Sequence, residues 1–167
     1  MIYEPAEDSF LLEKAVKKYV SGDVLDVGCG SGILSLVAKS KDCSVDSIDI
    51  DSSCVNYCKK LGLNAFVSDL FSNVSKKYDW IIFNPPYLPE DSLEDSESAL
   101  ITTGGKKGSE IVEKFLKDVR DYLKKDGKIL ILISSLTGGD EFFKGFSYEV
   151  VGEKKLFFEV LKVYLLQ

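Results

Sequence analysis

The chain has 167 residues, of which 45% are hydrophobic and 29% are charged, and its formal net charge at pH 7 is −6. This length supports one domain with a substantial core and is too short for two ordinary domains. The negative charge argues against a broad phosphate-binding surface, no apolar run reaches the roughly 18 residues of a membrane span, and the N-terminus lacks the basic start of a secretion signal. We therefore expect one cytoplasmic domain over residues 1–167, with residues 1–22 as a helical segment before the sheet, that binds no membrane and by itself no nucleic acid.

The first predicted element is a helix from Pro5 to Tyr19, with Glu7 and Asp8 in its first turn and apolar residues at helical spacing. A buried strand over 23–27 follows and runs into a glycine loop, 28–32, that opens a second helix. Glycines in a strand-to-helix turn permit positive φ and let a ligand approach the backbone, while the helix start presents free N–H groups. This segment predicts a cofactor-binding loop.

The spacing of the loop glycines distinguishes two classes of cofactor. Nicotinamide and flavin sites use Gly-x-Gly-x-x-Gly beneath a pyrophosphate. Here the pattern is Gly28-x-Gly30-x-Gly32 after Asp26, an acid that would repel a pyrophosphate but can engage a cationic amino-acid group directly or through water. The pattern is typical of proteins that bind S-adenosylmethionine.

Two further strands, predicted at 45–50 and 65–67, lead to acidic residues at their ends. Asp49 lies about 20 residues beyond the first loop glycine, where an acid can accept both hydroxyl hydrogens of a ribose. Asp69 can accept a hydrogen from an exocyclic amino group while Leu70 or Phe71 covers the face of the ring. Either acid alone could be a loop residue or a helix cap, but both in one series of strand-helix-strand units favour a nucleoside site.

The cysteines and the missing histidine limit the chemistry. The four cysteines, Cys29, Cys43, Cys54 and Cys58, include no Cys-x-x-Cys pair, so the sequence predicts no metal bound by this chain alone. We expect Cys54 and Cys58 to pack as small apolar residues on a helix. The absence of histidine removes the commonest general base, so the reaction should need no strong protein base.

The predicted strand 78–83 ends in Asn84-Pro85-Pro86-Tyr87, the four predicted catalytic residues. Two prolines fix φ and supply no N–H, so the carbonyls of Asn84 and Pro85 can point outward without a competing backbone donor. With the side-chain carbonyl of Asn84 and the flat ring of Tyr87, the loop suits a planar group that carries an NH₂, such as an amide or a nucleobase. The alternative is a loop that merely ends a strand.

The remaining elements complete a predicted α/β fold. Residues 88–109 show no periodicity, and residues 90–97 among them are acidic. A helix is predicted over 110–124, a strand over 127–133, a short helix or loop over 138–145, and an antiparallel hairpin from strands 148–151 and 157–165. We expect a twisted, mostly parallel sheet with helices on both faces and the hairpin at its C-terminal edge, with cofactor and substrate meeting at the carboxyl ends of the strands.

Together, residues 24–32, Asp49, Asp69 and the loop 84–87 resemble the class I S-adenosylmethionine-dependent methyltransferases that act on planar nitrogens. Residues 3–12 and 104–108 narrow the resemblance to the short archaeal and eukaryotic branch of the HemK family. The resemblance implies a Rossmann-like fold with a seven-stranded sheet, and methylation of the glutamine in the Gly-Gly-Gln motif of a class I release factor, with S-adenosylhomocysteine as product. It also implies a heterodimer with a small zinc-binding activator protein.

Alternatives remain open at this point: methylation of an adenine or cytosine amino group in RNA or DNA, methylation of lysine, or a silent cofactor-binding scaffold. The charge disfavours nucleic acid unless a partner supplies a basic surface. We expect the activator at the strand 65–67, because an unpaired edge strand offers backbone donors and acceptors. The candidate cofactor-binding residues are Glu7, Asp26, Gly28, Gly30, Gly32, Asp49, Ile50, Asp69, Leu70 and Asn84.

Overall fold

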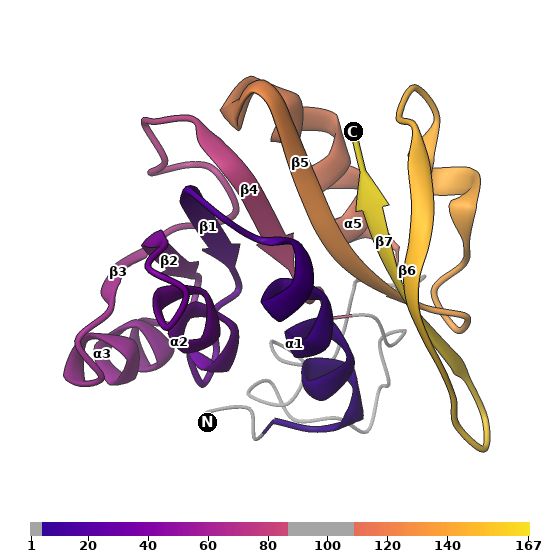
Figure 1. Ribbon diagram of the computed structural model, residues 1–167, viewed down its shortest axis with the longest axis horizontal. Helices are drawn as coiled ribbons and strands as arrows, with labels where there is room; N and C mark the ends of the chain where they lie inside the picture. The colour runs from indigo at the N-terminus through magenta and orange to yellow at the C-terminus, as the bar shows by residue number, and fades with distance from the viewer. Residues whose placement is uncertain (1–4, 87–108) are drawn as a thin grey trace.

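The computed structural model describes residues 5–86 and 109–167. Within them, seven strands form one sheet in the order β3-β2-β1-β4-β5-β7-β6 (Figure 1). The strands are β1 Asp23–Val27, β2 Ser44–Asp49, β3 Asn64–Val67, β4 Tyr78–Phe83, β5 Leu123–Ser134, β6 Tyr148–Lys155 and β7 Val160–Leu166. The first five strands in this order, from β3 to β5, are parallel to one another. β7 runs antiparallel to both β5 and β6. The predicted mostly parallel sheet with an antiparallel C-terminal hairpin is confirmed, but the bounds of the hairpin strands differ from the predicted 148–151 and 157–165: β6 extends to Lys155 and β7 starts at Val160, so residues 156–159 form the turn.

Helices cover both faces of the sheet. α1 (Glu7–Tyr19) and α2 (Ile33–Lys39) pack on one face, where Leu12 and Leu34 join an apolar cluster with strand residue Ile82. α5 (Glu110–Asp118) packs on the other face, where the Phe115 ring lies 4.5 Å from that of Phe83. α3 (Ser52–Lys60) packs against β3. None of the helices in the described parts of the chain is long and apolar enough to cross a lipid bilayer.

The predicted helix over 110–124 is wrong in its second half. The helix ends at Asp118, a 3-10 turn spans Val119–Tyr122, and β5 starts at Leu123. The Tyr122 ring stacks on Phe71 at 4.4 Å, and the Lys124 ammonium pairs with Asp23 at 2.5 Å and Asp79 at 2.9 Å. These contacts with residues far away in the chain draw it out of the helix, because tertiary packing overrides local propensity.

The order of the strands fixes where a ligand can bind. β1 lies between β2 and β4. After β1 the chain forms β2 and β3 on one side of it, and then returns to form β4 on the other side, so the direction in which strands are added reverses at β1. In open parallel sheets the crevice at such a reversal, outside the carboxyl ends of the strands, is the usual ligand site. The glycine loop follows β1 and Asn84 follows β4, so both lie at this point.

Candidate active site

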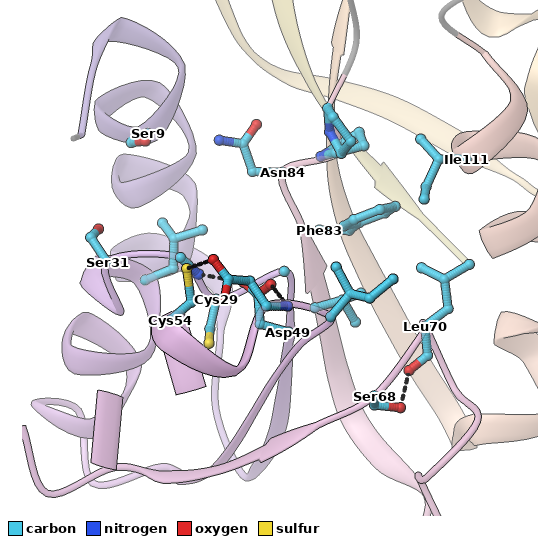
Figure 2. A pocket seen from close by; sticks show the side chains of 18 of the residues that line it. Ser9, Cys29, Ser31, Asp49, Cys54, Ser68, Leu70, Phe83, Asn84 and Ile111 are labelled. Carbon is cyan, nitrogen blue, oxygen red and sulfur yellow. Dashed lines mark hydrogen bonds between the residues drawn. The ribbon is translucent and has the colours of Figure 1, made fainter. Parts of the chain in front are cut away.

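A cavity of about 210 Å³ lies at the carboxyl ends of β1, β2 and β4 (Figure 2). The structure brings nine of the predicted residues to its wall: Gly28, Gly30, Asp49, Ile50, Asp69, Leu70, Asn84, Pro85 and Pro86. Three predicted residues, Glu7, Asp26 and Gly32, are not on the wall. The predictions for Tyr87 and for residues 104–108 lie outside the described residues.

The glycine loop forms one side of the cavity. Gly28, Gly30 and Gly32 all have positive φ, as the turn from β1 into α2 was predicted to require. Gly32 faces the interior, where an added Cβ would lie 3.0 Å from the Sγ of Cys58 and from the Cδ1 of Leu63. Its role is therefore close packing beneath the loop, whereas Gly28 and Gly30 present their backbone to the cavity.

Asp49 at the end of β2 bridges to the glycine loop. Its Oδ2 accepts a hydrogen bond from the Gly30 N–H at 2.9 Å, and its Oδ1 accepts one from the Asp51 N–H at 2.9 Å. Burial raises the pKa of Asp49, and these backbone hydrogen bonds oppose the rise. Since a carboxylate has about four lone-pair sites, each oxygen keeps capacity for one more donor, which suits a pair of hydroxyl groups.

Asp26 lies beneath the loop and is only 1% exposed. The Ser35 hydroxyl on α2 donates to Oδ2 of Asp26 at 2.6 Å and lies 2.7 Å from the hydroxyl of Ser47. Oδ1 of Asp26 has no hydrogen-bond partner within residues 5–86 and 109–167. Burial raises the pKa of Asp26 to about 7, because the charged form is poorly solvated there. A nearby cation would relieve this cost.

Asp69 and the apolar residues form the opposite side of the cavity. The Asp69 carboxylate is half exposed and pairs with the ammonium of Lys114 on α5, at 2.9 and 3.0 Å. An exposed pair of this kind is worth little, so Asp69 can exchange Lys114 for a ligand donor. Leu70, Phe83 and Ile111 supply the apolar wall, as Figure 2 shows. The sequence analysis missed Lys114 and Ile111, because helical spacing alone does not show which turn of α5 faces a pocket.

Asn84 is held in one orientation by the first turn of α1. Its Nδ2 donates to Oδ2 of Asp8 at 2.9 Å, and Asp8 is almost fully buried. A carboxylate can only accept, so this contact assigns the amide nitrogen of Asn84 to the Asp8 side. The Asn84 Oδ1 is buried without a hydrogen-bond partner in the described part of the chain. The site therefore presents an oriented carbonyl that lacks a donor.

Of the two acids in the first turn of α1, Asp8 and not the predicted Glu7 lines the cavity. Glu7 forms an ion pair with Lys154 on β6. The two acids are adjacent, and one helical step of about 100° decides which of them faces the sheet. The signal available in the sequence was the position of Asp8 one turn before the apolar Leu12, which is fully buried.

These groups fit the parts of S-adenosylmethionine. Asp49 offers acceptors for the ribose hydroxyls, Asp69 and the apolar wall suit an amino-bearing ring, and the buried Asp26 beneath the glycines suits a nearby positive charge. Oδ1 of Asp26 and Oδ1 of Asn84 have no hydrogen-bond partner within the described ranges, and these are the observations that call for a ligand, because buried polar atoms are normally hydrogen-bonded.

Comparison with known families and proteins gives a consistent result. Residues 7–162 match the model of the methyltransferase small domain. A putative protein N5-glutamine methyltransferase of Methanocaldococcus jannaschii is 40% identical over 97% of this chain and 89% of its own length. A release factor glutamine methyltransferase of Streptococcus pneumoniae is 35% identical over 69% of this chain, which spans about half (47%) of that relative.

Solved structures share the fold. The Mtq2 and Trm112 complex of E. cuniculi, described as responsible for methylation of the translation termination factor eRF1, matches with a TM-score of 0.81 at 23% identity, over 99% of this chain and 98% of that one. A T. thermophilus 16S rRNA N2 G1207 methyltransferase in complex with AdoMet and guanosine matches with a TM-score of 0.66 at 18% identity, over 93% of this chain and 38% of that one.

Proposed function

The chain belongs to the methyltransferase small domain family, and from this membership we propose that it methylates the glutamine side-chain amide of the Gly-Gly-Gln motif in a class I release factor. The enzyme uses S-adenosylmethionine as methyl donor. The relative from M. jannaschii, named for glutamine methylation, covers nearly the whole chain, which supports the choice of substrate. The observation that carries the proposal is the Asn84 carbonyl, which Asp8 orients and which is buried without a hydrogen-bond partner among the described residues.

The residues of this chain position the amide. The Asn84 Oδ1 accepts one hydrogen of the substrate NH₂, and the Pro85 carbonyl accepts the other, so the amide plane and its nitrogen are held in one place. When bound, S-adenosylmethionine supplies a methyl group activated by its sulfonium charge. Positive charge develops on the substrate nitrogen, so both acceptors bind the transition state more strongly than the ground state. The proton then leaves to water, and no histidine is needed.

The residues around the cavity bind different parts of the cofactor. Asp49 accepts the ribose hydroxyls, Asp69 accepts an amino hydrogen of the base, and Ile50 and Leu70 pack on its ring. Gly28 and Gly30 let the ligand approach the backbone. Asp26 stabilises the cationic end of the cofactor from beneath the loop, and Gly32 keeps the loop in place. Pro86 lies on the wall of the same cavity.

We also propose that the chain works as a heterodimer with a small zinc-binding activator that adds a strand to β3. β3 ends one side of the sheet; Val67 at its end is 43% exposed, and Leu61, shortly before it in the chain, is 38% exposed. An edge of this kind pairs readily with a partner strand. Co-expression with a candidate activator, followed by size-exclusion chromatography and an activity assay, tests this; a fully active monomer would contradict it.

A test of the substrate is transfer of a labelled methyl group to purified release factor. The expected result is label in the release factor and none in a variant whose motif glutamine is replaced by alanine. The second candidate, an amino group of adenine or cytosine, follows from the same Asn84 carbonyl, which accepts a hydrogen from any planar NH₂. Ribosomal RNA included in the same reaction separates the two, since the label would then appear in the RNA.

A further inference from the structure

The turn between β6 and β7 carries two exposed phenylalanines. Phe157 is 92% exposed and Phe158 is 83% exposed, whereas the next most exposed large apolar side chain of the described residues, Ile50, is 54% exposed. Their rings lie 4.6 Å apart in an edge-to-face arrangement. Large apolar groups that gather on a surface mark interaction sites more often than scattered single residues do.

The turn is fixed to the rest of the sheet. The Leu156 N–H donates to the Glu159 carbonyl at 2.8 Å, which closes the turn. The Ser135 N–H donates to the Val160 carbonyl at 2.9 Å, and the Val160 N–H donates to the Ser135 hydroxyl at 2.9 Å. The Ser134 hydroxyl also donates to the Glu159 carboxylate. Because the turn is already ordered, binding through both rings costs little further conformational entropy.

The turn lies at the same end of the sheet as the proposed active site. In the register of β4 and β5, Phe83 is paired with Ile131, so Asn84 is level with the following residues of β5. Ser134 lies three residues beyond Ile131, about 10 Å at the usual rise per residue, and holds the turn. Figure 1 shows this hairpin projecting past the carboxyl ends of β4 and β5.

A second set of contacts links the hairpin to the site. Lys154, three residues before Phe157, pairs with Glu7 at the start of α1. The next residue, Asp8, holds the side chain of Asn84. The aromatic pair therefore lies at the same end of the sheet as the cavity, but it does not belong to the residues that line the cavity.

We propose that Phe157 and Phe158 form a second contact point for the release-factor protein, binding an apolar patch on its surface outside the glutamine loop. This inference rests on the proposed function, because it names how the same site selects a folded protein. Aromatic anchors dominate protein interfaces, and the net charge of −6 opposes a phosphate-bearing partner.

The test compares two substrates with two variants. The double variant Phe157→Ser/Phe158→Ser removes the rings, and Val150→Ser is the control: Val150 is 46% exposed on the same hairpin but near the opposite end of β6. Each enzyme, together with its activator if one is required, is assayed with full-length release factor and with a short Gly-Gly-Gln peptide. Because anchor residues carry most of an interface, we expect the double variant to raise KM for the protein about 10- to 100-fold. kcat, both constants for the peptide, and all constants of the control should stay unchanged.

Several results would overturn the proposal. One is an unchanged KM for the protein, and another is an equal loss with protein and peptide. A third is a wild-type enzyme that self-associates in analytical ultracentrifugation while the double variant does not, since the pair would then bind a second copy of this chain.

A direct binding measurement with release factor whose motif glutamine is replaced by alanine separates this inference from the methylation reaction itself. Weaker binding by the double variant supports the contact even if no methyl transfer is seen, and equal binding refutes it.

Discussion

Replacing Asp26 by Asn should change how stability depends on pH. The folded-state pKa of Asp26 is about 7 and the ordinary value is 3.8, so the folded protein binds more protons than the unfolded chain between these values. The free energy of unfolding therefore falls as pH rises through this range. Each pKa unit corresponds to about 1.4 kcal/mol, which gives a penalty of about 4 kcal/mol in the wild type above pH 7.

Asn has the same shape and can still accept the hydrogen bond from Ser35, but it carries no charge. We expect the Asp26→Asn protein to match the wild type near pH 4 and to exceed its stability by about 4 kcal/mol near pH 8. Urea unfolding of both cofactor-free proteins across this range measures the difference directly. A difference that does not change with pH would refute the reasoning, because it would mean that Asp26 does not titrate between pH 4 and pH 8.

The same substitution should weaken cofactor binding. A cation near Asp26 favours its ionised form, so binding to the wild type should release a proton and strengthen as pH rises toward 7. Asp26→Asn should bind more weakly and lose this pH dependence. Calorimetry at several pH values separates this effect from the stability effect.

Three further substitutions test the rest of the site. Asn84→Ala should lower the rate of methyl transfer about 10²- to 10³-fold with nearly unchanged cofactor affinity, and wild-type single-turnover rates would contradict its role. Asp49→Ala should lose about 1.5–3 kcal/mol of cofactor binding, through loss of charge-assisted hydrogen bonds to the ribose; an unchanged titration would mean that Asp49 only supports the glycine loop. Asp8→Ala should reduce kcat with little effect on cofactor affinity, because it releases Asn84; unchanged kcat would show that Asn84 is oriented by other contacts.

The sequence was informative about the order of the elements and about which residues lie at strand ends. Buried strands such as 23–27 and 78–83 are rich in apolar residues, and their predicted bounds match the structure. Asp49 and Asn84 were correctly expected at one edge of the sheet, because the carboxyl ends of parallel strands meet there. The last part of the predicted helix over 110–124 was wrong because Lys124 finds its partners in β1 and β4, which are far away in the chain.

Contacts between side chains on different elements could not be predicted. The pair of Asp69 with Lys114 and the pair of Asp8 with Asn84 each join residues more than 40 positions apart. The sequence contains both members of each pair but no sign that they meet. The sequence left open whether Asp26 engages the cofactor directly or through water, and the structure buries Asp26 beneath the loop, which favours an effect through water or through the electrostatic field.

The most direct test of the account is to locate the methyl group on the product. Release factor and ribosomal RNA are incubated together with the enzyme, its candidate activator and S-adenosylmethionine, and the digested products are analysed by tandem mass spectrometry. The account predicts one added methyl group on the side-chain nitrogen of the Gly-Gly-Gln glutamine, absent with Asn84→Ala enzyme. A methyl group found on a nucleobase or a lysine, with the glutamine unmodified, would contradict it.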